Sequence, residues 1–238
     1  MAGGKRLDAF LDIASLYSFV AFEDLVRNLT AITANGVHVE LHPVLLGAIN
    51  KASGNQPPWA LKAKAKYIDY DRVRACRRVG LPPLALPDNF LARAITTSAL
   101  RALHHIKANH PQPVFLASFR ALFCAFWLRG GVDLTQDDNL RDTLLRATEG
   151  PDGKGGRLFP EADVESIMSG RAGMKDAVRG ATARALEVGA FGAPWFWASN
   201  GRGEEQPFFG SDRFNHIYEF LEIPFSDVEA KPPSKAKL

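Results

Sequence analysis

Cysteine is scarce in this chain of 238 residues, which contains only Cys76 and Cys124. The two stand far apart and match neither a zinc-binding spacing nor the Cys-x-x-Cys pair of redox proteins. This excludes a disulfide oxidoreductase that works through a cysteine pair. We interpret both residues as buried thiols of a protein in a reducing compartment.

Long apolar runs are also lacking, since none approaches the roughly 20 residues that a membrane span needs. Lys5, Arg6 and Asp8 interrupt the N-terminus too early for a signal peptide. A formal net charge of +3 is too small to indicate a nucleic-acid partner. The pair His104-His105 cannot share one helix face, so we expect no metal site there.

The first fifty residues carry strand and helix patterns in turn. Leu7 to Ile13 is typical of a buried strand, and apolar residues from Phe22 to Ile32 recur at helical spacing before Gly36. The segment "VHVELHPVLL" then alternates with period two, which predicts a second strand. One helical crossover between the two strands makes them parallel.

The middle of the chain carries helical patterns alone. "GNQPPW" marks a loop, after which strand signals stop. Helices are expected over Asp71–Val79, Phe90–Lys107, Val114–Leu128, Asn139–Thr148, Asp163–Met168 and Lys175–Val188. "EGPDGKGG", residues 149–156, is expected to be an exposed loop.

Strand patterns return near the end. "APWFWAS", the turn "NGRG" and "QPFFG" predict a hairpin, followed by an amphipathic helix that starts at "GSDR". The order of these elements along the chain predicts an α/β fold with βαβ and ββα halves split by an all-helical insertion. We expect one domain from 1–60 plus 186–228, an insertion domain at 61–185 and a disordered tail at 229–238.

The stretch "DIASLYSF" places Ser15 where a strand gives way to a helix. Redox proteins often place a Cys-x-x-Cys pair at such a corner, and here Ser15 and Ser18 take those two positions. Unpaired N–H groups at a helix start stabilise an anion. A serine nucleophile would need a base, whereas a hydroxyl that donates a hydrogen bond to a bound thiolate needs none. The alternative is that Ser15 only caps the helix, and Ser18 is interpreted as structural.

Two further segments are candidates for ligand contacts. In "FGAPWF", a cis bond before Pro194 would expose the backbone N–H and C=O of Ala193 to a peptide-like ligand, and a trans edge proline is the alternative. In "FGSDR", Ser211 and Asp212 open a predicted helix. Its N–H groups suit a carboxylate and Asp212 suits an ammonium, although N-capping explains both residues equally well.

Four segments together resemble the kappa class of glutathione transferases, relatives of the DsbA-type thioredoxin fold. They are "FLDIASLYSFVAFEDL", "GNQPPWALKAKAKY", "EVGAFGAPWF" and "FFGSDRF". The resemblance runs from Leu7 to Leu221 and includes the helical insertion. It implies a thioredoxin-like fold, glutathione as co-substrate without a metal, attack of glutathione on electrophiles or reduction of hydroperoxides, and a homodimer.

The resemblance also implies roles for particular residues. The catalytic serine is Ser15, which would donate to the sulfur of glutathione. The implied glutathione contacts are Leu16, Tyr17, Asn55, Lys64, Ala193, Pro194, Ser211 and Asp212. Two residues depart from the family pattern, because Leu16 replaces a proline and Ala193 replaces a leucine. Both changes predict a roomier pocket.

Two other functions stay open. A sister family with the same architecture isomerises 2-hydroxychromene-2-carboxylate with glutathione, and typically has Gly-Asn-Asp-Arg where this chain has Ser211. A non-catalytic binder of glutathione or other thiol ligands, with Ser15 as a cap, is the second alternative.

The last residues, "KPPSKAKL", are polar and proline-rich. Ala236-Lys237-Leu238 resembles the Ser-Lys-Leu signal that the peroxisomal import receptor reads. The kappa class has peroxisomal members, so we expect the peroxisome. A mitochondrial or cytosolic location, and a basic tail without a targeting role, are the alternatives.

Overall fold

The computed structural model describes residues 4–128, 130–150 and 155–228. The predicted tail at 229–238 and part of the predicted loop at 149–156 lie outside the described residues. Among the described helices, none is long and apolar enough to cross a bilayer.

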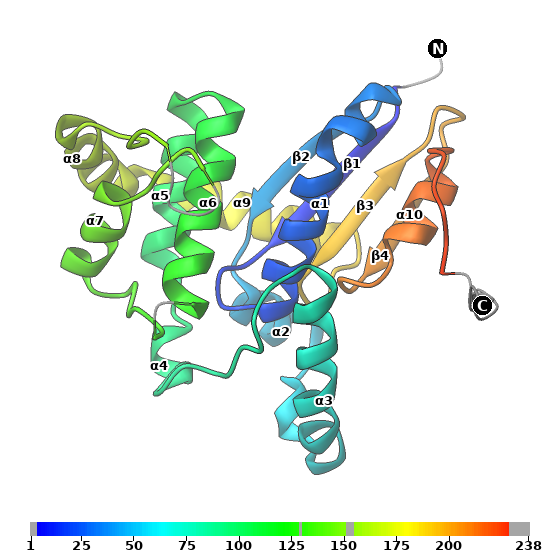
Figure 1. The fold of residues 1–238 in the computed structure, drawn as a ribbon, viewed down its shortest axis with the longest axis horizontal. Helices are drawn as coiled ribbons and strands as arrows, with labels where there is room; N and C mark the ends of the chain where they lie inside the picture. Colours follow the sequence, from blue (N-terminus) through cyan, green and yellow to red (C-terminus); the bar gives the residue numbers. More distant parts are fainter. Residues whose placement is uncertain (1–3, 129, 151–154, 229–238) are drawn as a thin grey trace, which may run out of the picture.

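A four-stranded mixed sheet forms the centre of the fold (Figure 1). Its strands are β1 (Arg6–Leu11), β2 (His38–Pro43), β3 (Trp195–Ser199) and β4 (Glu205–Phe209), in the order β2-β1-β3-β4. β1 runs parallel to β2 and antiparallel to β3, and β3 pairs antiparallel with β4. The predicted βαβ unit and terminal hairpin, and with them the α/β class, are confirmed.

Helices account for most of the remaining described chain. They are α1 (Leu16–Ala34), α2 (Leu46–Ser53), α3 (Lys62–Arg78), α4 (Phe90–Arg93), α5 (Thr97–Asn109), α6 (Gln112–Trp127), α7 (Asp137–Leu145), α8 (Glu161–Gly170), α9 (Lys175–Glu187) and α10 (Phe214–Phe220), with short 3-10 turns η1 (Pro58–Ala60) and η2 (Arg171–Met174). The helices α5 to α8 lie beyond the β2 edge of the sheet, and α10 lies beside β4 (Figure 1). The domain boundaries themselves stay a prediction.

Two apolar clusters cover the two faces of the sheet. Leu7 and Leu11 of β1 belong to a large cluster that contains the buried residues of α1, α5 and α6. Phe10, which points to the opposite face, belongs to a smaller cluster with residues of α2 and α9. Both faces of β1 are therefore covered, which agrees with the buried strand that the sequence predicted from Leu7 to Ile13.

Aromatic rings join the helical insertion to the sheet domain. Phe19 of α1 stacks on Phe123 of α6 with ring centroids 5.0 Å apart, and Phe119 also stacks on Phe123 at 4.9 Å. All three side chains are fully buried. Burying each of them contributes on the order of 2 kcal/mol, so α1 and α6 form one continuous core.

Several predicted helix boundaries were wrong. β2 ends at Pro43, and the helix α2 follows it where the sequence predicted more strand and then a loop. α3 begins at Lys62, well before the predicted start at Asp71. The single helix predicted over Phe90–Lys107 is two helices, α4 and α5, because the chain breaks around Thr96.

Candidate functional site

The corner between β1 and α1 is organised by the carboxylate of Asp12. This side chain is 1% exposed. One oxygen accepts the Ala14 N–H at 3.0 Å and the Thr96 hydroxyl at 2.8 Å, and the other accepts the Leu46 N–H at 2.7 Å. Asp12 therefore joins the β1–α1 turn to the starts of α2 and α5, which explains the break in the predicted helix at Thr96.

Burial also changes the pKa of the Asp12 carboxyl. Removal from water raises the pKa of Asp12 to about 6, although the three hydrogen-bond donors pull it down. The sequence analysis did not single out Asp12, because two of its partners lie far away in the chain.

Ser15 caps the N-terminus of α1. Its Oγ accepts the N–H of Ser18 at 3.1 Å and donates to the carbonyl oxygen of Ala193 at 2.9 Å. The residue is 7% exposed. The capping role expected as an alternative is therefore present, together with a contact to the segment before Pro194. Ser18 is fully buried, which agrees with its structural interpretation.

The first turn of α1 presents positive potential. Leu16 and Tyr17 occupy its first two positions, where backbone N–H groups have no partner within the helix. No acidic residue lies in this turn to offset the positive end of a 19-residue helix. An anion beside Ser15 would be stabilised by both features.

Tyr17 itself turns toward α3. Its hydroxyl donates to Asp71 Oδ2 at 2.5 Å, and burial together with the Asp71 carboxylate raises the pKa of Tyr17. The side chain thereby ties α1 to α3, while the backbone of Tyr17 remains at the helix start.

The Ala193-Pro194 bond is cis, as one of the two alternatives predicted. The Ala193 carbonyl, expected to be open to a ligand, accepts the hydrogen bond of Ser15. The Pro194 carbonyl accepts the N–H of Gly210 at 3.2 Å. Pro194 thus lies between Ser15 and the segment that contains Ser211.

Ser211 and Asp212 lie in a turn before α10, which begins at Phe214. The predicted helix start at "GSDR" was wrong, and no side chain caps α10. Ser211 is 4% exposed, whereas Asp212 is exposed and pairs with Arg213 at 2.7 Å.

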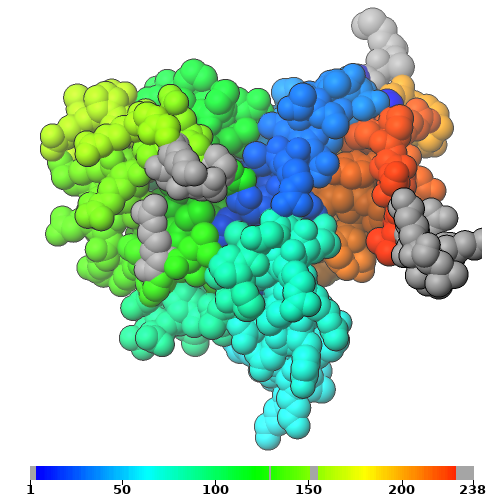
Figure 2. Space-filling model, in the orientation of Figure 1, coloured from blue at the N-terminus to red at the C-terminus, as the bar shows by residue number. Residues whose placement is uncertain are grey.

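The segment formed by η1 and α3 projects from the body of the molecule (Figure 2). Asn55 lies just before η1, and Lys64 lies in α3. Asn55 Nδ2 donates to the Phe191 carbonyl at 2.6 Å, which places it near the turn that leads into Pro194. Lys64 is exposed in the first turn of α3. No hydrogen bond or ion pair among the described residues joins Lys64 to the other candidates, so its role rests on the resemblance.

An apolar hollow of about 620 Å³ lies between η1 and α4. Its lining is mainly apolar, with Trp59, Leu86, Phe90 and Leu91, and its polar members are Asn89, Arg93 and Asp133. Phe90 also contacts Trp127, with ring centroids 6.0 Å apart.

The same tryptophan contacts the chain just before the Ser15 corner. Trp127 Nε1 donates to the Ile13 carbonyl at 2.8 Å, two residues before Ser15. Trp127 is buried and does not line the hollow, so its ring lies between Phe90 and the β1–α1 turn. The sequence analysis did not single out Trp127, because its partner Ile13 lies far away in the chain.

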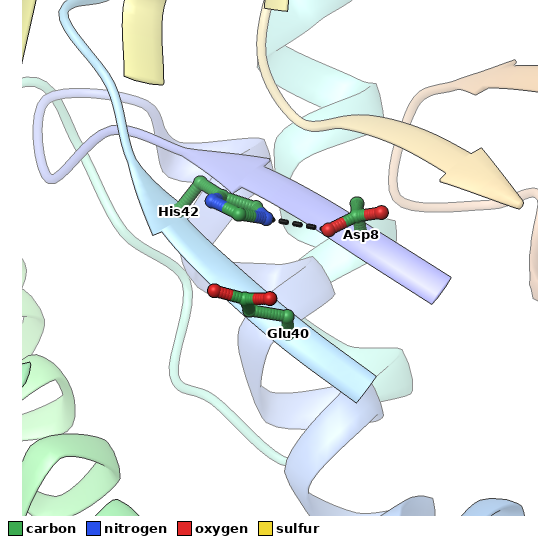
Figure 3. A group of neighbouring side chains, drawn as sticks. All are labelled: Asp8, Glu40 and His42. Atoms are coloured by element: carbon green, nitrogen blue, oxygen red, sulfur yellow. Dashed lines mark hydrogen bonds and ion pairs between the residues drawn. The ribbon is translucent and has the colours of Figure 1, made fainter. Parts of the chain in front are cut away.

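One group of described residues has converging metal-ligand types. Asp8, Glu40 and His42 each bring one ligand atom within 4.8 Å of the others, and His42 Nε2 lies 2.6 Å from Asp8 Oδ1 (Figure 3). Arg6 donates to Asp8 at 2.6 Å and to Glu40 at 2.5 Å, and Lys107 donates to Glu40 at 2.7 Å. Because these cations already neutralise both carboxylates, the group is an ion-pair network that a divalent ion would have to disrupt.

The charged partners of Asp8 also determine its pKa. Burial alone would raise the pKa of Asp8, but the hydrogen bonds from His42 and Arg6 outweigh it and lower the pKa to about 2. Asp8 therefore remains ionised at any pH at which the protein is expected to work.

The fold and the corner that carries Ser15 define a class of protein. The family model of the DSBA-like thioredoxin domain matches residues 6–222. The structure of a 2-hydroxychromene-2-carboxylate isomerase superposes with a TM-score of 0.67 at 19% identity, covering 91% of this chain and 94% of that chain. The chain is thus a member of the DsbA-like thioredoxin family.

Relatives in sequence narrow the family further. Glutathione S-transferase kappa 1 of Homo sapiens is 30% identical over 222 residues, which are 91% of each chain. Glutathione S-transferase kappa 1 of Caenorhabditis elegans is 27% identical over 221 residues, which are 92% of each chain. The chain belongs to the kappa glutathione S-transferases.

Proposed function

We propose that this protein binds glutathione at the β1–α1 corner and stabilises its thiolate for attack on small electrophiles or reduction of hydroperoxides. The observation that carries the proposal is the placement of the Ser15 hydroxyl at the start of α1, 2.9 Å from the Ala193 carbonyl. Kappa-class relatives at 27% and 30% identity support glutathione as the co-substrate.

The hydroxyl of Ser15 has one proton, which it donates to Ala193. If the cysteinyl N–H of glutathione took the place of Ser15 at the Ala193 carbonyl, the Ser15 hydroxyl would donate its hydrogen bond to the sulfur instead. The N–H groups of Leu16 and Tyr17 and the helix end would add to the stabilisation of the anion. Each unit by which the thiol pKa falls corresponds to about 1.4 kcal/mol.

The other contacts of glutathione are proposed from the family resemblance. Asp212 is proposed to meet the γ-glutamyl ammonium and Lys64 the glycyl carboxylate. Ser211, Asn55 and Pro194 would line the tripeptide between them. Asp212 is exposed and held by a single adjacent arginine, so a ligand ammonium can reach its carboxylate.

The apolar hollow between η1 and α4 is proposed to take the electrophile. Its volume of about 620 Å³ suits a drug-sized molecule. Trp59 and Phe90, whose rings meet edge to face at 5.4 Å, favour a flat aromatic substrate.

Conjugation of glutathione to a generic aryl halide tests this function, with a hydroperoxide as a second substrate. We expect wild-type turnover, and a loss of roughly 10- to 1000-fold in Ser15→Ala, because one oriented donor is removed. Ser169→Ala, which alters an exposed serine on α8, is the matched control and should retain full activity.

The outcome also separates the alternatives. Full activity of Ser15→Ala would contradict the role of its hydroxyl. Glutathione binding without turnover of any substrate would favour a non-catalytic binder. Isomerisation of 2-hydroxychromene-2-carboxylate in place of conjugation would assign the protein to the sister activity.

A peroxisomal location is proposed from Ala236-Lys237-Leu238, which lies outside the described residues. A fluorescent protein fused to the N-terminus should give a punctate peroxisomal signal, and deletion of Leu238 should disperse it. A diffuse or mitochondrial signal with the intact tail would refute the proposal.

A further inference from the structure

The turn that carries Ser211 and Asp212 is held from two sides. On one side, the Gly210 N–H donates to the Pro194 carbonyl at 3.2 Å. On the other, Arg78 of α3 donates to the Ser211 carbonyl at 2.6 Å. The backbone on both sides of the Ser211 N–H is therefore fixed before any ligand binds.

Gly210 shows how closely this turn is folded. Its φ of 105° is a conformation that favours glycine, and a Cβ placed there would lie 2.8 Å from Asp212 Oδ1. The Asp212 carboxylate thus lies directly over Gly210. A shift of the turn by a fraction of an ångström would move this carboxylate as well.

Arg78 reaches the turn from a second anchor. The guanidinium also donates to Asp24 of α1, whose side chain is 10% exposed. Since the guanidinium is planar and its N–H groups have fixed directions, bonding to Asp24 sets where the bond to Ser211 can form. The hydroxyl of Tyr218 in α10 is buried close by, and burial together with the charge of Asp24 raises its pKa to about 12.

These contacts close a ring through α1. The helix begins at Ser15, whose hydroxyl contacts Ala193, and further along it carries Asp24, which holds Arg78. Arg78 in turn holds Ser211. Both ends of the proposed glutathione site are thereby anchored to α1. The two anchor points lie about nine residues apart along this helix, which is roughly 13 Å.

We propose that Arg78, anchored by Asp24, is a positioning residue that sets the Ser211–Asp212 turn relative to Ser15 and so determines selectivity for the γ-glutamyl end of the ligand. The inference rests on the proposed glutathione site. Arg78 acts through Ser211 and needs no contact with the reacting sulfur, so its loss should affect binding and selectivity more than the chemical step.

The test replaces Arg78 by methionine, which keeps an unbranched apolar stem and removes the hydrogen-bond donors. Arg78→Met should raise the KM for glutathione by about tenfold, as expected for loss of a charged hydrogen bond, while kcat changes little. Wild type should prefer glutathione over N-acetylglutathione, which lacks the ammonium. This preference should shrink in the variant, an effect that lost stability alone would not produce.

Hydrogen exchange supplies a readout that needs no ligand. Peptides that cover residues 209–214 should exchange faster in Arg78→Met than in wild type. Arg77→Met, an exposed neighbour on the same helix, is the matched control and should change neither exchange nor KM. Asp24→Asn, which removes the anchor of Arg78 and keeps the arginine, should change both in the same direction to a smaller extent.

Unchanged exchange, KM and preference in Arg78→Met and Asp24→Asn would overturn the inference. If Arg78→Met does not fold, Asp24→Asn alone decides by the same criteria. A wild type that fails to bind glutathione would instead refute the proposed function, and the exchange measurement would still show whether Arg78 holds the turn.

Discussion

Asp12 illustrates how a single buried residue can organise a site without being visible in the sequence pattern. Its carboxylate accepts hydrogen bonds from Ala14, Leu46 and Thr96, which lie on three separate segments. The neighbouring Ser15 was predicted, because a hydroxyl at a strand-to-helix boundary is a local signal. The partners of Asp12 depend on tertiary packing, so no local pattern contains them.

The titration of Asp12 makes a prediction about stability. Its pKa is raised from 3.8 to about 6, so folding favours the protonated form. Its contribution to stability is therefore fully present below about pH 4 and is lost as the pH rises through about 6. By linkage this loss amounts to about 3 kcal/mol.

Denaturant unfolding of wild type and Asp12→Asn across this range measures the effect, because asparagine does not titrate. The free energy of unfolding of wild type minus that of the variant should decrease as the pH rises from about 4 to about 7. A difference that stays constant across this range would mean that Asp12 titrates as it does in the unfolded chain.

At the scale of elements, the periodic segments were predictable and the short ones were not. α1, α6 and α9 have buried stripes at helical spacing, and the sequence located them to within a few residues. α2 follows β2 directly, and its first N–H is bonded by the remote Asp12. The break between α4 and α5 depends on the same carboxylate. Tertiary contacts therefore determine both the start of α2 and this break.

The candidate site divides in the same way. Ser15, Ala193, Pro194 and Ser211 were candidates from local sequence signals and from the resemblance, and hydrogen bonds link their segments in the structure. Arg78 was not named, because an arginine near the end of a charged helix has no local feature that distinguishes it from Arg77.

The turn before α10 and the start of α3 carry the next prediction. Asp212→Asn should raise the KM for glutathione about tenfold, because the ligand ammonium loses a charged partner. Lys64→Ala should raise it to a similar or smaller extent. Steady-state kinetics with glutathione as the varied substrate measures both effects.

Two control variants change exposed residues of the same type outside the proposed glutathione contacts. Asp138→Asn changes an exposed aspartate on α7, and Lys66→Ala changes an exposed lysine near Lys64 on α3. Neither should alter the KM. Unchanged KM values in both Asp212→Asn and Lys64→Ala would show that the glutathione contacts have been assigned to the wrong residues.

At the scale of the molecule, the segment formed by η1 and α3 projects from the body (Figure 2). Leu61, Tyr67 and Tyr70 on it are 56%, 58% and 67% exposed. Exposed apolar side chains that gather on one segment are typical of an interaction surface. The homodimer that the family resemblance implies stays a prediction, and this surface is the candidate for its interface.

Light scattering at micromolar concentration tests the assembly. Wild type should have twice the mass of one chain, and Tyr70→Glu should shift the protein toward the monomer, because a charge would be buried at the interface. Ser169→Glu on the exposed surface of α8 should leave the mass unchanged. A monomeric wild type would contradict the dimer without affecting the assignment of the glutathione site.

The central claim is that the β1–α1 corner ionises the thiol of bound glutathione. Ultraviolet absorbance of the thiolate, titrated against pH in the complex, measures this directly. For wild type we expect the thiol pKa to fall by about two units, which makes the bound thiol mostly ionised at neutral pH, and for Ser15→Ala we expect most of this shift to disappear while glutathione still binds. Glutathione that binds to wild type with its thiol titrating as it does in water would contradict the account.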